Sequence, residues 1–424
     1  MISLRSKIII RFSGFLLVFI LCGCDSNVKR ELREAQQSGA YFSKDNKVLT
    51  MGPTVALKKF VIPSSVISVC DEAFQFVCSD LTEVVIPNSV KEIGGFAFQH
   101  CSKLKEVVLP EGIKDISVGL FRDCTGLKKV IIPKSVTRIS SYAFQGCSQL
   151  NNIEISDAVK QIGSQAFHGS GLKEIIIPPG TYFEGQAFMS CHLLVNAKTG
   201  TCNIPKMSFY DCTSLKTVEI SEGATRIGSS AFYNCKKLFK IKMPDSLRNI
   251  QDSAFKNCTS LVHVKMPDNI ECIGEEAFKD CINLKNISIP SKVKKIGICA
   301  FMNCNNLTDI HIPEKVEYLS CGAFWNCKNL TTVKISEGVK HIERRAFAGC
   351  SLLKKIQLPG SIEEIDGYAF ENCTNLQEVI FPENVKIISE NAFKGCEKLK
   401  MVVISEKCQI QPGAFPWKCR IIRN

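Results

Sequence analysis

The stretch "IGEEAFKDCINLKNISIPSKV", residues 273–293, decides the fold because near-copies of it fill most of the chain. Its phrase Ala-Phe-x-x-Cys returns at 323–327 and 369–373, and its phenylalanine recurs every 23 residues in most cases, with departures of 24, 21, 21 and 22. A repeat of this period predicts a solenoid whose stacked units share one continuous core. The 424 residues are therefore not expected to form two or three separate globular domains. Sixteen units are marked by Phe74, Phe98, Phe121, Phe144, Phe167, Phe188, Phe209, Phe232, Phe255, Phe278, Phe301, Phe324, Phe347, Phe370, Phe393 and Phe415.

Each part of the repeat has a physical role. Residues 287–289 alternate apolar and polar, which is the period of a strand with one buried face. Pro290 has no backbone donor, so the strand is expected to end there. A second short extended piece is expected over 293–296, followed by a bend at Gly297 and a brief helical turn at Ala-Phe.

The order L-x-x-I-x-I-P-x-x-V-x-x-I-G-x-x-A-F-x-x-C resembles the BspA-like leucine-rich repeat family from about residue 57 to 415. The resemblance implies an α/β solenoid over residues 57–424, a right-handed horseshoe or arc of about sixteen units with a parallel β-sheet on its concave side. It also implies a cell-surface adhesin that binds host or partner-cell proteins, which is an analogy because a fold does not fix a function.

The period is disturbed between residues 168 and 209. Two intervals of 21 residues fall there, Ser170 stands in the cysteine position, and "LVNAKTGTCNIP" (194–205) lacks the strand pattern. We expect an irregular break at about 168–209, where the stack bends or changes twist. The break is either a binding notch or a tolerated deletion. Residues 405–424 are expected to form a C-terminal cap.

Fourteen of the 23 cysteines occupy one position of the repeat. Zinc needs converging ligands, often in C-x-x-C pairs, whereas these thiols recur singly and form a line. Disulfides between neighbouring units are possible by distance, but parallel inward side chains disfavour them. We predict a structural ladder of small buried thiols that donate S–H to backbone carbonyls of the adjoining unit. Its members are Cys78, Cys101, Cys124, Cys147, Cys191, Cys212, Cys235, Cys258, Cys281, Cys304, Cys327, Cys350, Cys373 and Cys396.

Cys408 and Cys419 lie outside the ladder and flank the last repeat phenylalanine, Phe415. A disulfide between them would close a loop and staple this end of the stack. Two free thiols are the alternative.

The first residues predict export. Arg5, Lys7 and Arg11 precede the apolar run 12–21, which is too short to span a bilayer and is typical of a signal peptide. The following "LCGC" resembles the lipobox of bacterial lipoproteins.

This lipobox implies a signal peptide over residues 1–23 and a lipidated Cys24 that anchors the chain to a membrane. An ordinary cleaved signal with a free Cys24 is the alternative. Residues 24–56 are then a tether or an N-terminal cap, because 25–40 are polar and charged without an apolar stripe.

The residue between the last two apolar positions of each strand should face outward on the concave sheet. This column has an apolar stripe in its first units and a basic, polar centre in later ones. An exposed apolar stripe suggests a partner surface, although β-branched residues also suit strands for their own sake. The candidate partner-binding residues are Val85, Val108, Ile131, Ile176, Lys242, Lys265, His311 and Lys334.

No motif for catalysis, cofactor binding or metal binding appears. The six histidines show no H-E-x-x-H spacing, and neither G-x-S-x-G nor a P-loop is present. The formal net charge of +12 is spread without a Lys/Arg block, so nucleic acid is not an expected partner. We expect no cofactor, no enzyme activity and a monomer.

The sequence therefore predicts a non-catalytic lipoprotein of the bacterial cell envelope, at the outer membrane or cell surface, that binds an unidentified protein. The alternatives are a structural or glycan-contacting envelope component, or an accessory module to an envelope enzyme.

Overall fold

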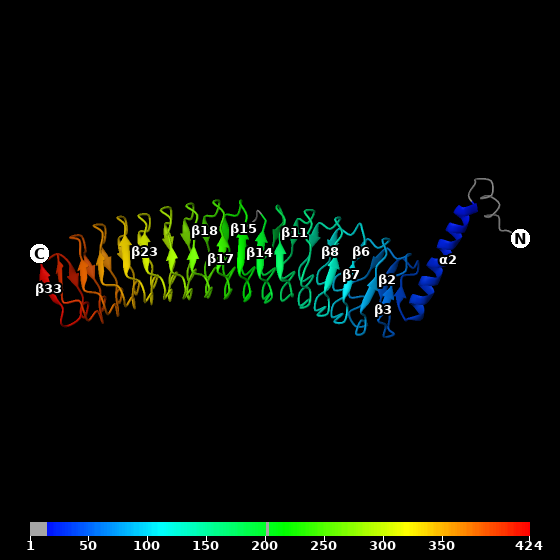
Figure 1. Ribbon diagram of the computed structural model, residues 1–424, viewed down its shortest axis with the longest axis horizontal. Helices are drawn as coiled ribbons and strands as arrows, with labels where there is room; N and C mark the ends of the chain where they lie inside the picture. Colours follow the sequence, from blue (N-terminus) through cyan, green and yellow to red (C-terminus); the bar gives the residue numbers. More distant parts are fainter. Residues whose placement is uncertain (1–14, 201–202) are drawn as a thin grey trace. The chain divides into compact units, whose positions relative to one another are not determined.

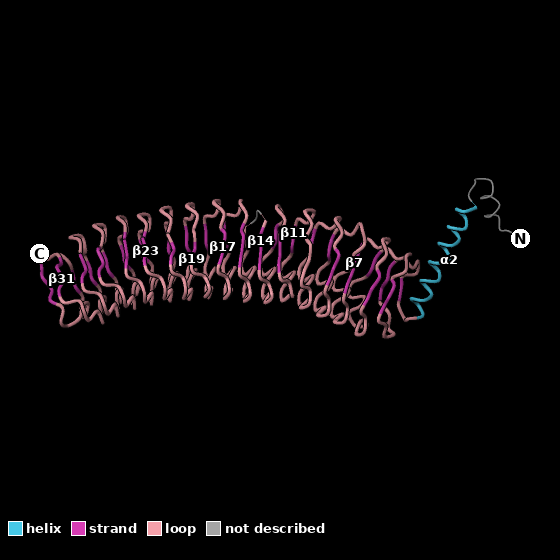
Figure 2. Tube along the Cα trace, viewed as in Figure 1, coloured by secondary structure: helices cyan, strands magenta, loops and turns pink. Residues whose placement is uncertain are grey.

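The computed structural model describes residues 15–200 and 203–424, with side chains described from Ser26 onward. The chain divides into two compact units, one up to Leu172 and one from Lys173. In each unit successive coils stack as a parallel β-solenoid (Figures 1 and 2). Most coils carry a strand from the L-x-x-I-x-I segment on one face, here the front face, and a two-residue strand before the Gly bend on the other, the back face. The predicted leucine-rich repeat solenoid is confirmed.

Unit 1 begins with the helix α2 (Phe15–Gln37) and an antiparallel hairpin. The hairpin consists of β1 (Tyr41–Phe42) and β2 (Val48–Met51). The front face contains β3 (Lys59–Val61), β5 (Glu83–Val85), β7 (Glu106–Val108) and β9 (Lys129–Ile131). The back face contains β4 (Ser68–Val69), β6 (Glu92–Ile93), β8 (Asp115–Ile116), β10 (Arg138–Ile139) and β11 (Gln161–Ile162).

Unit 2 repeats the two faces. Its front strands are β12 (Glu174–Ile176), β14 (Asn196–Thr199), β15 (Thr217–Ile220), β17 (Lys240–Lys242), β19 (His263–Val264), β21 (Asn286–Ile287), β23 (Asp309–Ile312), β25 (Thr332–Ile335), β27 (Lys355–Gln357), β29 (Glu378–Ile380), β31 (Met401–Ile404) and β33 (Arg420–Arg423). Its back strands are β13 (Tyr182–Phe183), β16 (Arg226–Ile227), β18 (Asn249–Ile250), β20 (Cys272–Ile273), β22 (Lys295–Ile296), β24 (Tyr318–Leu319), β26 (His341–Ile342), β28 (Glu364–Ile365), β30 (Ile387–Ile388) and β32 (Gln409–Ile410). The last strands, β32 and β33, continue both faces through the predicted C-terminal cap.

The core of each unit is built around the repeat phenylalanines. Their rings stack with centroid separations of 4.7–5.7 Å in unit 1 and 4.9–5.6 Å in unit 2. In most coils the phenylalanine N–H also donates to the alanine carbonyl of the next coil, as from Phe278 to Ala300 at 2.8 Å. Each buried ring contributes about 2 kcal/mol of transfer free energy. Stacking and hydrogen bonding together hold identical positions of successive coils in register.

Turns replace the brief helix expected at the Ala-Phe phrase. Glu276 and Asp280 flank Phe278 with φ of 53° and 61°, left-handed values that a helical turn does not contain. Outside α2 the described residues include no α-helix, so the coils of the solenoid consist of strands and turns. A glycine is needed at position 297 because the backbones of two neighbouring coils lie close together there. An added Cβ would lie 2.5 Å from the backbone nitrogen of Glu275 in the preceding coil.

The ladder cysteines are buried and hydrogen-bonded. Eleven of their thiols, from Cys124 onward, donate to the carbonyl of the phenylalanine in the preceding coil, with S–O distances of 3.0–3.4 Å. Burial raises the pKa of thiols such as Cys281, so they remain protonated donors. The structure places these bonds at Cys124, Cys147, Cys212, Cys235, Cys258, Cys281, Cys304, Cys327, Cys350, Cys373 and Cys396.

The prediction of a free ladder thiol is wrong for Cys101, which forms a disulfide with Cys78. Their Cα atoms are 5.2 Å apart, inside the range that a disulfide requires. The physical reason is an extra residue in "AFQFVC" (73–78), which places Cys78 four residues after its phenylalanine instead of three. Cys78 therefore leaves the ladder position and meets the thiol of the next coil. Cys408 and Cys419 are free thiols, so the hypothesised staple does not form.

The segment 194–205 is more regular than its sequence suggested. The strand β14 pairs in parallel with both β12 and β15, so the expectation that the strand pattern is lost there is wrong. Ala197 and Thr199 fill its buried positions, and both are small enough to escape a pattern search for large apolar residues. Lys198 lies between them and faces solvent.

The segment after the lipobox forms a cap on unit 1. Ala35 of α2 is buried, and the Glu31 carboxylate accepts hydrogen bonds from the Ser64 N–H at 2.9 Å and from its hydroxyl at 2.7 Å. These contacts hold the C-terminal half of the helix against the first coil. The predicted signal core up to residue 14, and the side chain of Cys24, lie outside what the structure describes.

Replacing Phe278 by alanine is expected to lower the free energy of unfolding by about 3–5 kcal/mol, because it leaves a cavity in the stacked column. Phe239→Ala is the matched control, since this phenylalanine is 51% exposed and should cost less than about 0.5 kcal/mol. Denaturant unfolding followed by circular dichroism measures both. Equal losses would contradict a buried column.

Reduction of the denatured chain is expected to release two more thiols than denaturation alone, because Cys78 and Cys101 are bonded. Thiol titration with and without reductant measures the difference. Cys101→Ser should abolish it, whereas Cys124→Ser should leave it at two. Identical counts for the parent chain would rule out the disulfide.

Candidate binding surface

Exposed side chains of the front face form columns that run from coil to coil. Most front strands alternate buried and exposed residues, as in the buried Ile310 between exposed Asp309 and His311 of β23. The parallel register aligns equal positions, for example His311 with Lys334. Side chains of one column are therefore neighbours on the surface.

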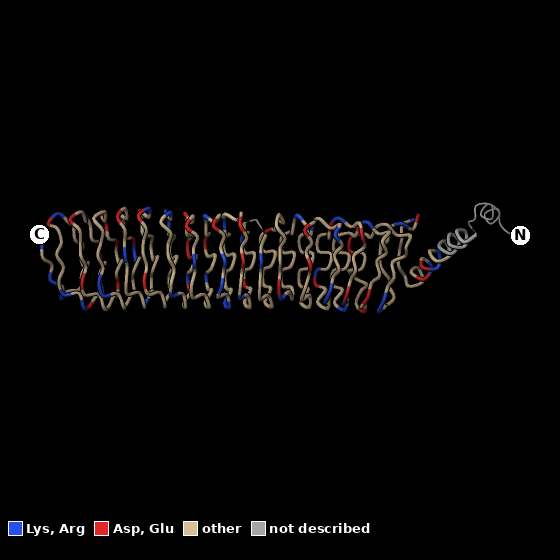
Figure 3. The backbone as a smooth tube through the Cα atoms, turned by 45° about the horizontal axis from the view of Figure 1, so that its top comes forward, with Lys and Arg blue, Asp and Glu red and all other residues tan. Residues whose placement is uncertain are grey.

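All eight candidate partner-binding residues lie exposed on the front face of their unit. Val85, Val108 and Ile131 belong to unit 1, whereas Ile176, Lys242, Lys265, His311 and Lys334 belong to unit 2. Basic and acidic residues are interspersed along the coils without a block of one sign (Figure 3). Of these candidates, the three in unit 1 are apolar, whereas four of the five in unit 2 are lysine or histidine.

Unit 1 presents a row of four exposed β-branched side chains, here the apolar row. It consists of Val61, Val85, Val108 and Ile131, which are 42%, 38%, 57% and 46% exposed. The row crosses the four neighbouring strands β3, β5, β7 and β9. Val61 was missed from the sequence, although "KFV" at 59–61 aligns with "EVV" at 83–85. An ion pair of 2.7 Å between Lys59 and Glu83 borders the row.

The apolar row ends at a hollow of about 430 Å³ beside β9. Its lining includes Lys129, Ile131, Asn152 and Glu154. The hollow lies where residues 151–156, expected as the next front strand, form no strand. A side chain inserted here would contact Ile131 and the polar groups beside it.

In unit 2 the strand β14 adds Lys198 to the column, a residue that sequence reasoning missed with its strand. Lys198 and Lys242 approach the Glu219 carboxylate from the coils on either side, at 3.8 Å and 3.2 Å. The hydrogen bond from Lys242 and the charge of Lys198 hold the pKa of Glu219 below its ordinary value, against the opposing effect of partial burial. The carboxylate thus stays ionised and offsets part of the lysine charge.

The centre of unit 2 keeps unpaired positive charge. Among the described residues no carboxylate forms an ion pair with Lys265 or Lys334. His311 bonds to the Ser336 hydroxyl at 2.8 Å. Partial burial, assisted by Lys334, lowers the pKa of His311, so the lysines supply the charge at neutral pH.

Two further observations bear on the predicted anchor and on metal binding. No helix in the described part of the chain is both long and apolar enough to cross a membrane. Across the described residues no three or more His, Cys, Asp or Glu side chains gather in a way that could hold a metal ion.

A solved structure of a bacterial leucine-rich repeat protein shares this architecture. A leucine-rich repeat protein from Bacteroides ovatus is 28% identical, with a TM-score of 0.73, covering 91% of this chain and 97% of its own. A leucine rich cell surface protein from Faecalibacterium prausnitzii is 24% identical, covering 88% and 92%, with a TM-score of 0.36. No curated protein matches the sequence.

The family model for the BspA type leucine rich repeat region matches residues 67–195, 194–308 and 294–422, which together span most of the repeats. The stacked phenylalanines, the Pro turn and the cysteine ladder account for the positions that this repeat shares. The chain belongs to the BspA-type leucine-rich repeat family.

Proposed function

We propose that the chain is a non-catalytic lipoprotein of the bacterial cell surface that binds a host or partner-cell protein through its front face. The apolar row of unit 1 carries this proposal. Four neighbouring strands each expose a β-branched side chain there, and the row ends at a hollow. Exposed apolar patches of this kind are typical of protein–protein contacts.

The lysines of unit 2 supply a second, electrostatic component. Lys242, Lys265 and Lys334 give the front face of unit 2 a positive character that favours encounter with an acidic surface. Such charges mainly raise the rate of association, whereas buried apolar contacts mainly lower the rate of dissociation.

Two features support export and anchoring. The lipobox at 21–24 supplies an acceptor thiol in Cys24. The disulfide Cys78–Cys101 is typical of a chain that folds in an oxidising compartment. The disulfide suits a protein that leaves the cytoplasm, and the lipobox suits one that stays attached to a membrane.

The double variant Val108→Ser, Ile131→Ser is expected to weaken binding to a matrix protein at least about tenfold, since truncation of central interface residues costs about 1 kcal/mol or more each. Surface plasmon resonance with immobilised fibronectin, laminin and collagen measures it. Ile67→Ser is the matched control, because Ile67 is exposed as much as Ile131, 46%, but lies outside the apolar row. Unchanged affinity of the double variant would contradict a binding role for the row.

Cys24→Ala is expected to abolish labelling by an alkyne palmitate analogue and to move the chain from the membrane to the soluble fraction. Cys70→Ala is the control for loss of an unrelated thiol. Persistent labelling of Cys24→Ala would contradict lipidation at this residue. Protease treatment of intact cells should degrade the parent chain, whereas complete protection would contradict a surface location.

A further inference from the structure

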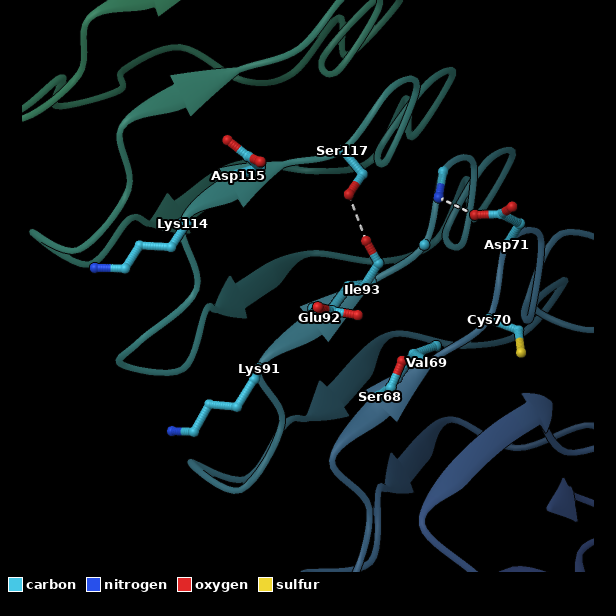
Figure 4. Close-up of a pocket in the computed structure, with 12 residues that line it drawn as sticks. Ser68, Val69, Cys70, Asp71, Lys91, Glu92, Ile93, Lys114, Asp115 and Ser117 are labelled. Carbon is cyan, nitrogen blue, oxygen red and sulfur yellow. Dashed lines mark hydrogen bonds between the residues drawn. The ribbon is translucent and has the colours of Figure 1, made fainter. Parts of the chain in front are cut away.

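A hollow of about 540 Å³ opens on the back face of unit 1, away from the strands of the apolar row (Figure 4). Its lining comes from residues 68–71 and 91–95 and from Lys114, Asp115 and Ser117. Three successive coils therefore contribute to it. Nothing in the repeat pattern assigns a role to this face.

The hollow exists because the back sheet of unit 1 is interrupted between β6 and β8. One coil further on, Thr137 N–H donates to Lys114 O at 2.7 Å and Ser140 N–H donates to Ile116 O at 2.8 Å. Within the described chain, the equivalent bonds from the Lys114 and Ser117 N–H groups to β6 are not formed. The Ser117 hydroxyl donates to the Ile93 carbonyl instead (Figure 4).

The opening leaves polar groups without partners at its rim. The backbone N–H groups of Lys114 and Ser117, which would normally pair across a sheet, are available to a ligand that enters there, whereas the Ile93 carbonyl already accepts from the Ser117 hydroxyl. At Gly94 an added Cβ would lie 2.3 Å from the backbone nitrogen of Asp71, so this glycine permits the close approach of the two neighbouring coils that line the hollow.

The charged side chains of the hollow differ in whether they form ion pairs or hydrogen bonds with other residues. Asp115 is held by Arg138 at 3.1 Å, and Lys91 donates to the Asn88 carbonyl at 2.7 Å. Glu92 and Lys114 form no ion pair with any described residue. The side chains of Lys91 and Lys114 extend in the same direction at one end of the hollow (Figure 4).

This mixture of groups selects the chemistry of the ligand. Asp71, Glu92 and Asp115 would repel a simple anion, and the two lysines would repel a simple cation. An apolar ligand would cover the exposed charged groups of the hollow without pairing them. A neutral polyhydroxyl compound fits, because each hydroxyl can donate to a carboxylate and accept from an ammonium or N–H group.

A second hollow of about 510 Å³ adjoins the first and shares Asp71, Gly95, Asp115 and Ser117 with it. It extends to Phe96 and Val118, so one side is apolar. The Phe96 ring is fixed over Gly119, whose added Cβ would lie 2.2 Å from it. A sugar ring has both a polar edge and an apolar C–H face, and the two hollows together offer partners for both.

We propose that the back face of unit 1 binds a neutral oligosaccharide of at least two sugar rings, one over Gly94 and Gly95 and the next against Phe96 and Val118. Glu92 accepts hydrogen bonds from hydroxyls of the first ring, and Lys114 donates to them. This site is independent of protein binding at the front face, because the two use different residues on opposite sides of the coils.

Isothermal titration of the full-length chain with neutral tri- and tetrasaccharides of glucose, galactose, mannose and N-acetylglucosamine tests the proposal. At least one is expected to bind with a Kd of about 1 mM or tighter. Glu92→Gln and Lys114→Met should each weaken it about tenfold, since hydrogen bonds to charged groups contribute that much. Glu106→Gln and Lys105→Met, on the front face of the same coils, are matched controls.

Absence of binding by every saccharide of the panel would overturn the proposal. Equal affinity of the Glu92 and Lys114 variants and the parent chain would overturn the site. Binding of acidic saccharides alone, strengthened by Glu92→Gln, would overturn the neutral class. Weakening by the two back-face variants with unchanged matrix-protein binding would support the site and separate it from the front face.

Discussion

Stacking of one phenylalanine per coil on the phenylalanines of its neighbours is the constraint on which the rest of the structure depends. A single coil cannot bury its own ring, so each coil needs the next. The accompanying bond from the phenylalanine N–H to the next alanine carbonyl fixes the register along each unit. Once the register is fixed, the thiol of one coil lies beside the phenylalanine carbonyl of the coil before it, and every outward position aligns with its counterparts. Surface columns are thus a consequence of the core column.

The separation of buried core positions from exposed outward positions explains which residues can differ from coil to coil. Substitutions in the core column disturb neighbouring coils, whereas outward residues such as Ser288 and Lys265 differ freely between coils. Unit 1 uses this freedom to expose the apolar row, and unit 2 uses it to expose lysines around Glu219. The back face gains a polar hollow from a different source, the failure of β6 and β8 to pair. In such a fold, chemical variety resides in departures from the repeat and in its outward column.

The solenoid and most of the outward residues of the front face could be predicted from the sequence. The spacing of the phenylalanines and the alternation within strands both show which residues are buried. The sequence was insufficient where small residues replaced large ones. Because Ala197 and Thr199 are not large apolar residues, the sequence pattern did not predict β14, and Lys198 was missed together with this strand. The extra residue before Cys78 is visible in the sequence, but the direction it gives to the sulfur depends on backbone geometry. The hollow at Lys114 and Ser117 depends on missing hydrogen bonds between coils, which no single-residue pattern records.

Hydrogen–deuterium exchange of the free chain tests most directly whether buried columns hold the coils together and leave the β6–β8 seam open. Amides of the Ala-Phe phrases, such as Phe278, should exchange slowest in each unit, because they are bonded to the next coil and buried. Amides of Lys114 and Ser117 should exchange much faster than those of Thr137 and Ser140, their bonded counterparts one coil further on. Uniformly fast exchange at the Ala-Phe phrases, or equal protection of the two sets of back-face amides, would contradict the account.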